Sequence, residues 1–171
     1  MALVFAILGC GASQPAPTET VDLPTNLGRP VYSVPLSEAP PDVRDTWPLV
    51  HAALHGAAPA AAPEDLDEWR RARSQLIQAL QPAWGRLLAG DAQQVLFAAI
   101  TRGLLLEGLC TTTAEHPSGT AEQVDAAAQE ARRAYAECVR YAPQAPAVLT
   151  DWETTCLERS AALGDHLLVA P

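Results

Sequence analysis

Residues 91–110 read DAQQVLFAAITRGLLLEGLC, and this stretch decides the fold class. Apolar side chains occupy nearly every face of a helix drawn from Val95 to Leu109, a pattern typical of the central helix of a bundle in a soluble protein. Asp91 precedes the apolar run and is expected to cap the helix. The run is interrupted by polar residues and is too short to cross a bilayer, so we predict a buried helix.

Two helices are expected before this stretch. The first covers residues 46–55 with Thr46 as its cap, and the segment GAAPAAAP at 56–63 breaks it. The second begins at Pro63, where acidic residues in the first turn favour the positive end of the helix dipole. Pro82 is expected to end or kink this second helix because proline removes a backbone hydrogen bond.

Two more helices are expected after the central one, beyond a loop at 111–119. Thr120 and Gln123 have the spacing of a capping box and open the first of them. Thr150 and Glu153 repeat this spacing at the start of the last helix. The Ala-rich composition, poor in aromatic and β-branched residues, also favours helices over sheets. We therefore predict an all-α fold, either a compact bundle or a helical-hairpin array of four to five helices.

Three cysteines lie in this helical region, at positions 110, 138 and 156. At most one pair can form within a monomer, and the sequence alone leaves three pairings open. The last two helices are expected to run antiparallel, which would bring Cys138 beside Cys156. These two residues are the disulfide candidates, with a chain that has no disulfide as the main alternative. Cys110 is expected to be a buried thiol.

The residues before the helices have a different composition. Residues 11–44 contain seven prolines and show neither helical nor strand periodicity, which predicts a disordered proline-rich tether. Its sub-stretch RPVYSVPL at 29–36 is apolar enough to dock as an extended strand, although an unstructured spacer is the favoured reading. The linker with its cysteine is expected to span 10–45, and the helical domain 46–171.

The first nine residues, MALVFAILG, are mostly apolar and are followed by Cys10. The sequence Ile7-Leu8-Gly9-Cys10 resembles a bacterial lipobox, in which a small residue precedes the cysteine that accepts a diacylglyceryl group. The resemblance implies that residues 1–9 are a lipoprotein signal peptide and that Cys10 carries the lipid. Because no basic residue precedes the apolar run, we expect this leader to be truncated and the true translation start to lie upstream.

The lipobox resemblance implies a lipid-anchored protein of the bacterial cell envelope, where disulfides are permitted. Gly11 stands where an inner-membrane retention signal would have Asp, which favours the outer membrane. The chain has 20 acidic and 11 basic residues and a formal net charge of −9. This charge repels phosphate backbones, so we expect no nucleic-acid partner and expect membrane contact through the N-terminal lipid.

The sequence HAALH places His51 and His55 one helical turn apart, a spacing that lets two imidazoles share a metal ion. The zinc-peptidase pattern would need Glu where Ala52 stands. A third ligand would have to come from His116, His166 or a distant carboxylate, and the spacing supports none of these. We predict no metal or other cofactor, and two surface histidines are the favoured reading of the pair.

Glu107 is the one acidic residue inside the apolar run GLLLEGL. It could act as an acid–base group, but an interhelical ion pair with an arginine, or an exposed strip of the helix, is the favoured interpretation. The sequence motifs of common hydrolases, NTPases, dehydrogenases, thioredoxin-like enzymes and c-type cytochromes are absent from the sequence. We therefore predict no catalytic residues and a non-catalytic binding or structural module with a protein partner of unknown identity.

The stretch ARRAYAECVRYAPQAP at 131–146 resembles the second helix and closing turn of a tetratricopeptide repeat. Ala131, Tyr135 and Cys138 match the small-aromatic-small positions of that family, and Pro143 matches its terminal proline. The resemblance implies a surface that holds other proteins, but such repeats stack in sets of about three or more. No second copy is visible, so a generic antiparallel helix pair is the favoured reading.

Overall fold

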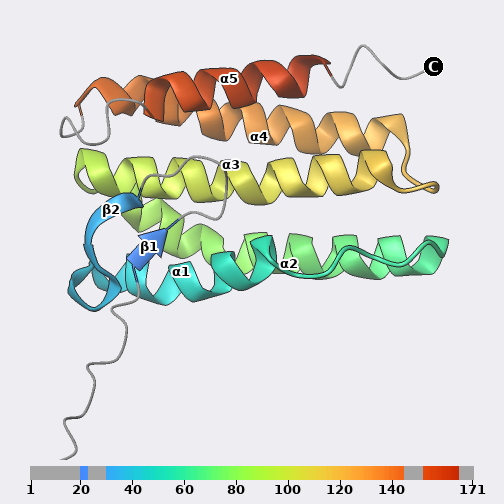
Figure 1. The fold of residues 1–171 in the computed structure, drawn as a ribbon, viewed down its shortest axis with the longest axis horizontal. Coiled ribbons are helices and arrows are strands. Elements are labelled where there is room, and N and C mark those ends of the chain that lie inside the picture. The colour runs from blue at the N-terminus through green and yellow to red at the C-terminus, as the bar shows by residue number, and fades with distance from the viewer. Residues whose placement is uncertain (1–19, 23–29, 145–151, 166–171) are drawn as a thin grey trace, which may run out of the picture.

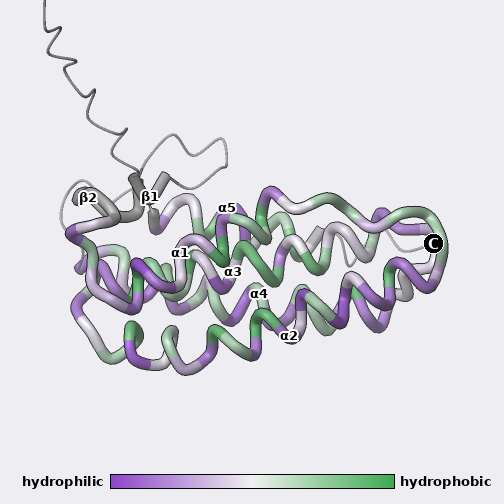
Figure 2. The backbone as a smooth tube through the Cα atoms, turned by 90° about the horizontal axis from the view of Figure 1, so that it is seen from below, coloured by the Kyte–Doolittle hydropathy of each residue, from purple (hydrophilic) through white to green (hydrophobic). Residues whose placement is uncertain are grey.

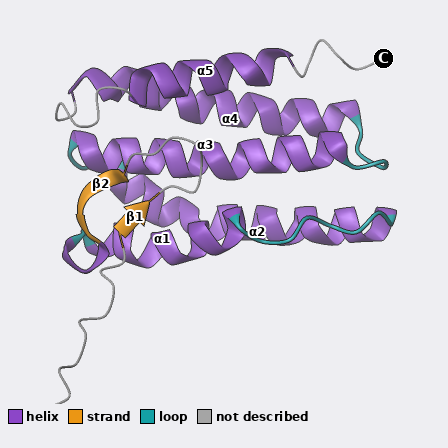
Figure 3. Ribbon diagram, viewed as in Figure 1, coloured by secondary structure: helices purple, strands orange, loops and turns teal. Residues whose placement is uncertain are grey.

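The computed structural model describes residues 20–22, 30–144 and 152–165 of the 171-residue chain. In chain order its elements are β1 (Thr20–Asp22), β2 (Pro30–Pro35), the 3-10 turn η1 (Leu36–Glu38), α1 (Pro41–Leu54), α2 (Pro63–Leu87), α3 (Ala92–Glu115), α4 (Ala121–Tyr141), the 3-10 turn η2 (Ala142–Gln144) and α5 (Trp152–Asp165). The described part is therefore mostly helical and holds five helices, which confirms the predicted all-α fold (Figure 3).

The helices form a layered array around α3. Figure 1 shows α5, α4 and α3 following one another across the molecule, with α1 and α2 beyond α3. Helix α3 contacts α1, α2 and α4, whereas α5 packs mainly on α4. Helices that follow one another in the chain pack as antiparallel hairpins. Because α3 has helices on both sides, it forms the inner layer of the array.

The α3 helix is longer than the sequence suggested. Its cap is the predicted one, because the Asp91 carboxylate accepts a hydrogen bond from the Gln94 N–H at 2.9 Å. Its end at Glu115 corrects the prediction of a loop beginning at residue 111. The hydroxyls of Thr111 and Thr113 donate to backbone carbonyls four residues earlier in the same helix, so these polar side chains are satisfied without leaving it.

The prediction that this segment is too short to cross a bilayer is also wrong. Within the described residues α3 is the one helix that is long and apolar enough for a membrane span, by length and composition alone. Most of its apolar window is buried inside the protein, against the neighbouring helices. Burial of this kind fits the core helix of a bundle, as expected from its apolar character on every face.

Two further helix boundaries differ from the predictions. Helix α1 begins at Pro41 and not at Thr46, so residues 41–45 belong to the helical domain and not to the linker. Pro41 stands in the first turn, where its missing N–H has no intrahelical acceptor to lose. Helix α2 runs through Pro82 to Leu87, so of the two effects expected of that proline, an end or a kink, the end is wrong. The break between α1 and α2 falls in GAAPAAAP, as predicted.

The segment assigned to a disordered tether holds a short strand pair. Strands β1 and β2 are antiparallel, with Thr20 opposite Pro35 and Asp22 opposite Pro30. Strand β2 also lies against α3 (Figure 1). An extended strand was the less favoured reading of this sub-stretch, and its pairing and docking correct the prediction of a wholly unstructured linker. Cys10 and the linker residues 11–19 and 23–29 lie outside the described residues.

The α4 helix opens as predicted. The Thr120 hydroxyl accepts from the Gln123 N–H and the Gln123 side chain accepts from the Thr120 N–H, which completes the capping box. The corresponding residue of α5, Thr150, lies outside the described residues. Hydrophilic and hydrophobic residues alternate along the helices in Figure 2, as expected for helices that bury one face.

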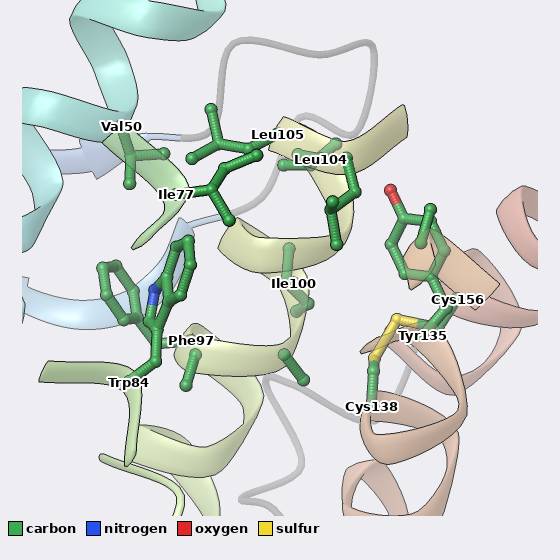
Figure 4. Close-up of a cluster of buried hydrophobic side chains, with 14 of the residues drawn as sticks. Val50, Ile77, Trp84, Phe97, Ile100, Leu104, Leu105, Tyr135, Cys138 and Cys156 are labelled. Carbon is green, nitrogen blue, oxygen red and sulfur yellow. A yellow bond between two sulfur atoms is a disulfide. The ribbon is translucent and has the colours of Figure 1, made fainter. Parts of the chain in front are cut away.

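The core lies on both sides of α3. Figure 4 shows Trp84 and Phe97 on one side of this helix and Tyr135 on the other. All three side chains are fully buried, together with Trp47 of α1. Large aromatic anchors against many small residues hold the layers close together.

Candidate functional sites

Three polar side chains meet inside the layered part of the protein. Glu107 comes from α3, Tyr135 from α4 and Arg159 from α5. The Tyr135 hydroxyl donates to Glu107 Oε2 at 2.5 Å. Arg159 Nη1 donates to both Glu107 Oε1 and Oε2 at 2.8 Å. We call these three residues the Glu107 cluster.

The Glu107 cluster is largely withdrawn from solvent. Tyr135 is fully buried, and the Glu107 and Arg159 side chains keep only 21% and 22% of their exposure. The favoured interpretation of Glu107, an ion pair between helices, is therefore confirmed. No local sequence pattern indicates its partners, which lie 28 and 52 residues further along the chain.

Electrostatics hold Tyr135 and Arg159 each in one protonation state. Burial, the nearby carboxylate and the hydrogen bond to it raise the pKa of Tyr135 well above its usual range. Burial alone would lower the pKa of Arg159, but the interactions with Tyr135 and Glu107 raise it. Tyr135 therefore stays neutral and Arg159 stays charged throughout the physiological range.

This arrangement is suited to holding helices together and not to proton transfer. A general acid or base needs a pKa near the working pH and a partner atom on the substrate. The Tyr135 proton is held by Glu107, and both carboxylate oxygens already accept charge-assisted hydrogen bonds. The Glu107 carboxylate and the Tyr135 hydroxyl are accordingly paired within the cluster.

The predicted disulfide is present next to this cluster. Cys138 and Cys156 are bonded, with their Cα atoms 6.2 Å apart, and both are buried (Figure 4). Cys110 is a buried free thiol, as expected. Burial raises the pKa of Cys110, and the charge on Glu107 adds to that effect. A thiol of this kind is a poor nucleophile because little thiolate forms near neutral pH.

The two histidines of α1 lie side by side on the surface. The ring centroids of His51 and His55 are 4.4 Å apart, and His51 also meets the edge of Trp47 at 5.5 Å. Both imidazoles are exposed. Among the residues that the structure describes, no group of three or more His, Cys, Asp or Glu side chains has the geometry of a metal site.

The other two histidines do not complete this pair. His166 lies outside the described residues. His116 is buried, and both of its ring nitrogens have hydrogen-bond partners. Its Nε2 lies 2.7 Å from the Ala60 carbonyl oxygen, and its Nδ1 accepts from the Ser118 N–H at 3.1 Å. These contacts assign the proton to Nε2 and tie the loop before α2 to the loop after α3.

Comparisons with protein-family models, with curated proteins and with solved structures find no significant match to the chain. Residues 7–10 lie outside the described residues, so the lipobox stays a prediction. The tetratricopeptide resemblance stays a prediction as well. Its matched residues Ala131, Tyr135 and Cys138 are all buried on α4, as on any helix that packs on two neighbours.

Proposed function

We propose that the chain is a lipid-anchored protein of the bacterial cell envelope whose helical domain acts as a non-catalytic binding or structural module. The sequence ILGC at 7–10, followed by a proline-rich segment, carries the proposal. Acyl chains on Cys10 would anchor the protein, since each buried methylene contributes about 0.8 kcal/mol and two or more chains give stable attachment. Gly11 favours the outer membrane over the inner one.

The disulfide supports this location. Bonds between cysteines persist in exported proteins and are rare in the cytosol, where thiols are kept reduced. The Cys138–Cys156 bond is buried between α4 and α5, which is the place of a structural bond. A chain that matures in an oxidising compartment would keep it.

The Glu107 cluster supports the non-catalytic part. Glu107 is the candidate acid–base residue of the sequence analysis. Its carboxylate accepts hydrogen bonds from Tyr135 of α4 and Arg159 of α5, and so it connects helices. The protein's work is then done by its helical surface, toward a protein partner. The net charge of −9 disfavours nucleic acid as that partner.

The lysine-free sequence offers a direct test of the anchor. All 11 of its Lys and Arg residues are arginines, so the only primary amine of the chain is its N-terminal one. Triacylation of Cys10 would block that amine. Protein purified in detergent from its native host should therefore resist an amine-reactive ester, and its intact mass should equal residues 10–171 plus one diacylglyceryl group on the sulfur and one acyl chain on the α-amine.

The control for this test is Cys10→Ser, which should carry no acyl chain, keep its leader and leave its α-amino group open to the label. Wild-type protein with an uncleaved leader and a free Cys10 thiol would refute the anchor. A cleaved, diacylated protein would take one label but would still support it, because its mass identifies the lipid.

A second candidate function is metal or small-ligand binding in the periplasm, favoured by the 4.4 Å separation of the His51 and His55 rings. Cu²⁺ is the natural probe, because imidazole sites bind it most strongly among the first-row divalent metals. Copper binding should quench the fluorescence of Trp47 beside His51. A stoichiometric site that survives His51→Ala would end this alternative, and so would wild-type protein that binds no copper.

A further inference from the structure

Helix α5 is attached through few buried side chains. Among the α5 residues whose side chains the structure describes, Cys156 and Leu163 are buried, while Leu157 is 51% exposed. A helix of 14 residues gains most of its stability from tertiary packing and not from its own propensity. Among the described side chains of α5, these two are the ones that are fully withdrawn from solvent.

The disulfide and the Glu107 cluster lie one helical turn apart on the same interface. On α4, Tyr135 comes three residues before Cys138, and on α5, Arg159 comes three residues after Cys156. Residues three apart share a helix face, and the two helices run antiparallel. The covalent bond at one level therefore fixes the register at the next level, where Arg159 meets Glu107 (Figure 4 shows the bond and Tyr135).

From this geometry we infer that α5 is a redox-dependent latch: it docks in the oxidised chain and detaches when the Cys138–Cys156 bond is absent, while α1 to α4 stay folded. Without the bond, docking would have to order α5 through the contacts that remain, which include the burial of Leu163 and the hydrogen bonds made by Arg132 and Arg159. The Glu107 carboxylate would keep the Tyr135 hydrogen bond and regain water in place of Arg159.

The redox step is a thiol–disulfide exchange with a dithiol. The dithiol gives two electrons and two protons, the bond between the sulfurs of Cys138 and Cys156 breaks, two thiols form, and the dithiol becomes a disulfide. Both sulfurs are buried, so a reductant reaches them only after α5 has opened. The docked helix thus protects the bond that holds it.

The remaining four helices have their own core. Helix α3 contacts α1, α2 and α4 directly, and the large buried residues Trp47, Trp84 and Phe97 all lie outside α5. Loss of α5 uncovers one face of α4 and leaves these residues in place. Helices α1 to α4 can therefore stay folded when α5 detaches, whether or not the protein carries a lipid anchor.

Hydrogen exchange of the full chain, followed by mass spectrometry, tests the latch. In Cys138→Ser/Cys156→Ser, peptides from α5 should exchange at least about tenfold faster than in the oxidised wild type, and peptides from α2 and α3 should keep their protection. Cys110→Ser is the matched control, because it also loses a buried sulfur but keeps the disulfide. Its α5 peptides should exchange as slowly as those of the wild type.

Arg159→Met with the disulfide intact separates the bond from the ion pair, and its α5 should remain protected. The inference is overturned if α5 keeps full protection in the double serine variant, because the side chains would then suffice. Loss of protection throughout that variant would also overturn it, since α1 to α4 would not stand alone. An Arg159→Met variant whose α5 opens as far as in the double serine variant would assign the latch to the ion pair.

Discussion

Arg159 of α5 donates to both carboxylate oxygens of Glu107 in α3 at 2.8 Å, although α4 lies between these two helices in the layer order (Figure 1). The pair therefore connects two layers that are not consecutive in the chain. Tyr135 of α4 donates to the same carboxylate, so one acidic group joins three helices. In the oxidised protein, α5 is thus held to α3 through Glu107 as well as to α4 through the disulfide.

Removal of the arginine should destabilise the protein. Arg159→Met keeps the apolar stem but leaves the Glu107 charge largely buried with one hydrogen bond, so the free energy of unfolding should fall by about 2 kcal/mol. Glu107→Gln in the same chain should restore part of that loss, because the amide oxygen accepts from Tyr135 without a buried charge. Urea unfolding of the wild type, both single variants and the double variant measures the coupling. Additive single effects would show that the two side chains do not interact.

The raised pKa of Tyr135 predicts a loss of stability at alkaline pH. In the unfolded chain this tyrosine ionises near pH 10, whereas in the folded chain it stays protonated at higher pH. Between those two pKa values the unfolded state binds fewer protons, so the free energy of unfolding falls by up to about 1.4 kcal/mol per pH unit. The stabilisation is complete below about pH 10 and is lost as pH rises above it.

Tyr135→Phe is the comparison that isolates this effect. It should be less stable at pH 7 because it lacks the hydrogen bond to Glu107, but its stability should fall less steeply above pH 10. Urea unfolding at several pH values between 7 and 11 gives both slopes. Equal slopes for the two proteins would contradict the assignment.

Much of the fold could be predicted because its signals are local. Asp91 and the Thr120–Gln123 capping box act within one helical turn, and the structure has both. The Cys138–Cys156 pairing followed from one antiparallel hairpin. The fold class needed nothing beyond these signals and the apolar run of α3.

The remaining features depend on context that a local pattern does not carry. The proline-rich composition and the lack of periodicity in residues 11–44 predict a tether that includes Pro41, yet a proline also fits the first turn of a helix. Arg159 lies 52 residues from Glu107. With 11 arginines in the chain, only the register of α5 on α4 selects this one.

Two glycines of α3 should respond in opposite ways to alanine. A Cβ on Gly103 would lie 2.5 Å from Tyr135 Cε1, inside a packed interface, whereas a Cβ on Gly108 would meet nothing within 4 Å. Gly103→Ala should therefore lower the free energy of unfolding by about 1–3 kcal/mol through overpacking. Gly108→Ala should raise it by about 1 kcal/mol through helix propensity. Thermal and urea unfolding of the two variants measure these changes, and stabilisation by both would show that α3 and α4 can move apart at Gly103.

A buried threonine holds the indole of Trp84. The Trp84 Nε1–H donates to Thr101 Oγ1 at 3.1 Å, and that hydroxyl donates onward to the Phe97 carbonyl oxygen at 2.7 Å. Thr101→Val keeps the shape but leaves the buried indole N–H without an acceptor, which should cost about 1–3 kcal/mol of unfolding free energy. Thr113→Val is the matched control, since Thr113 is equally buried but its hydroxyl donates within its own helix to Leu109. It should cost less than about 1 kcal/mol, because only a local bond to an already paired carbonyl is lost. Urea unfolding followed by tryptophan fluorescence measures both variants, and equal losses would mean that the bond between Trp84 and Thr101 adds nothing to the packing of α2 on α3.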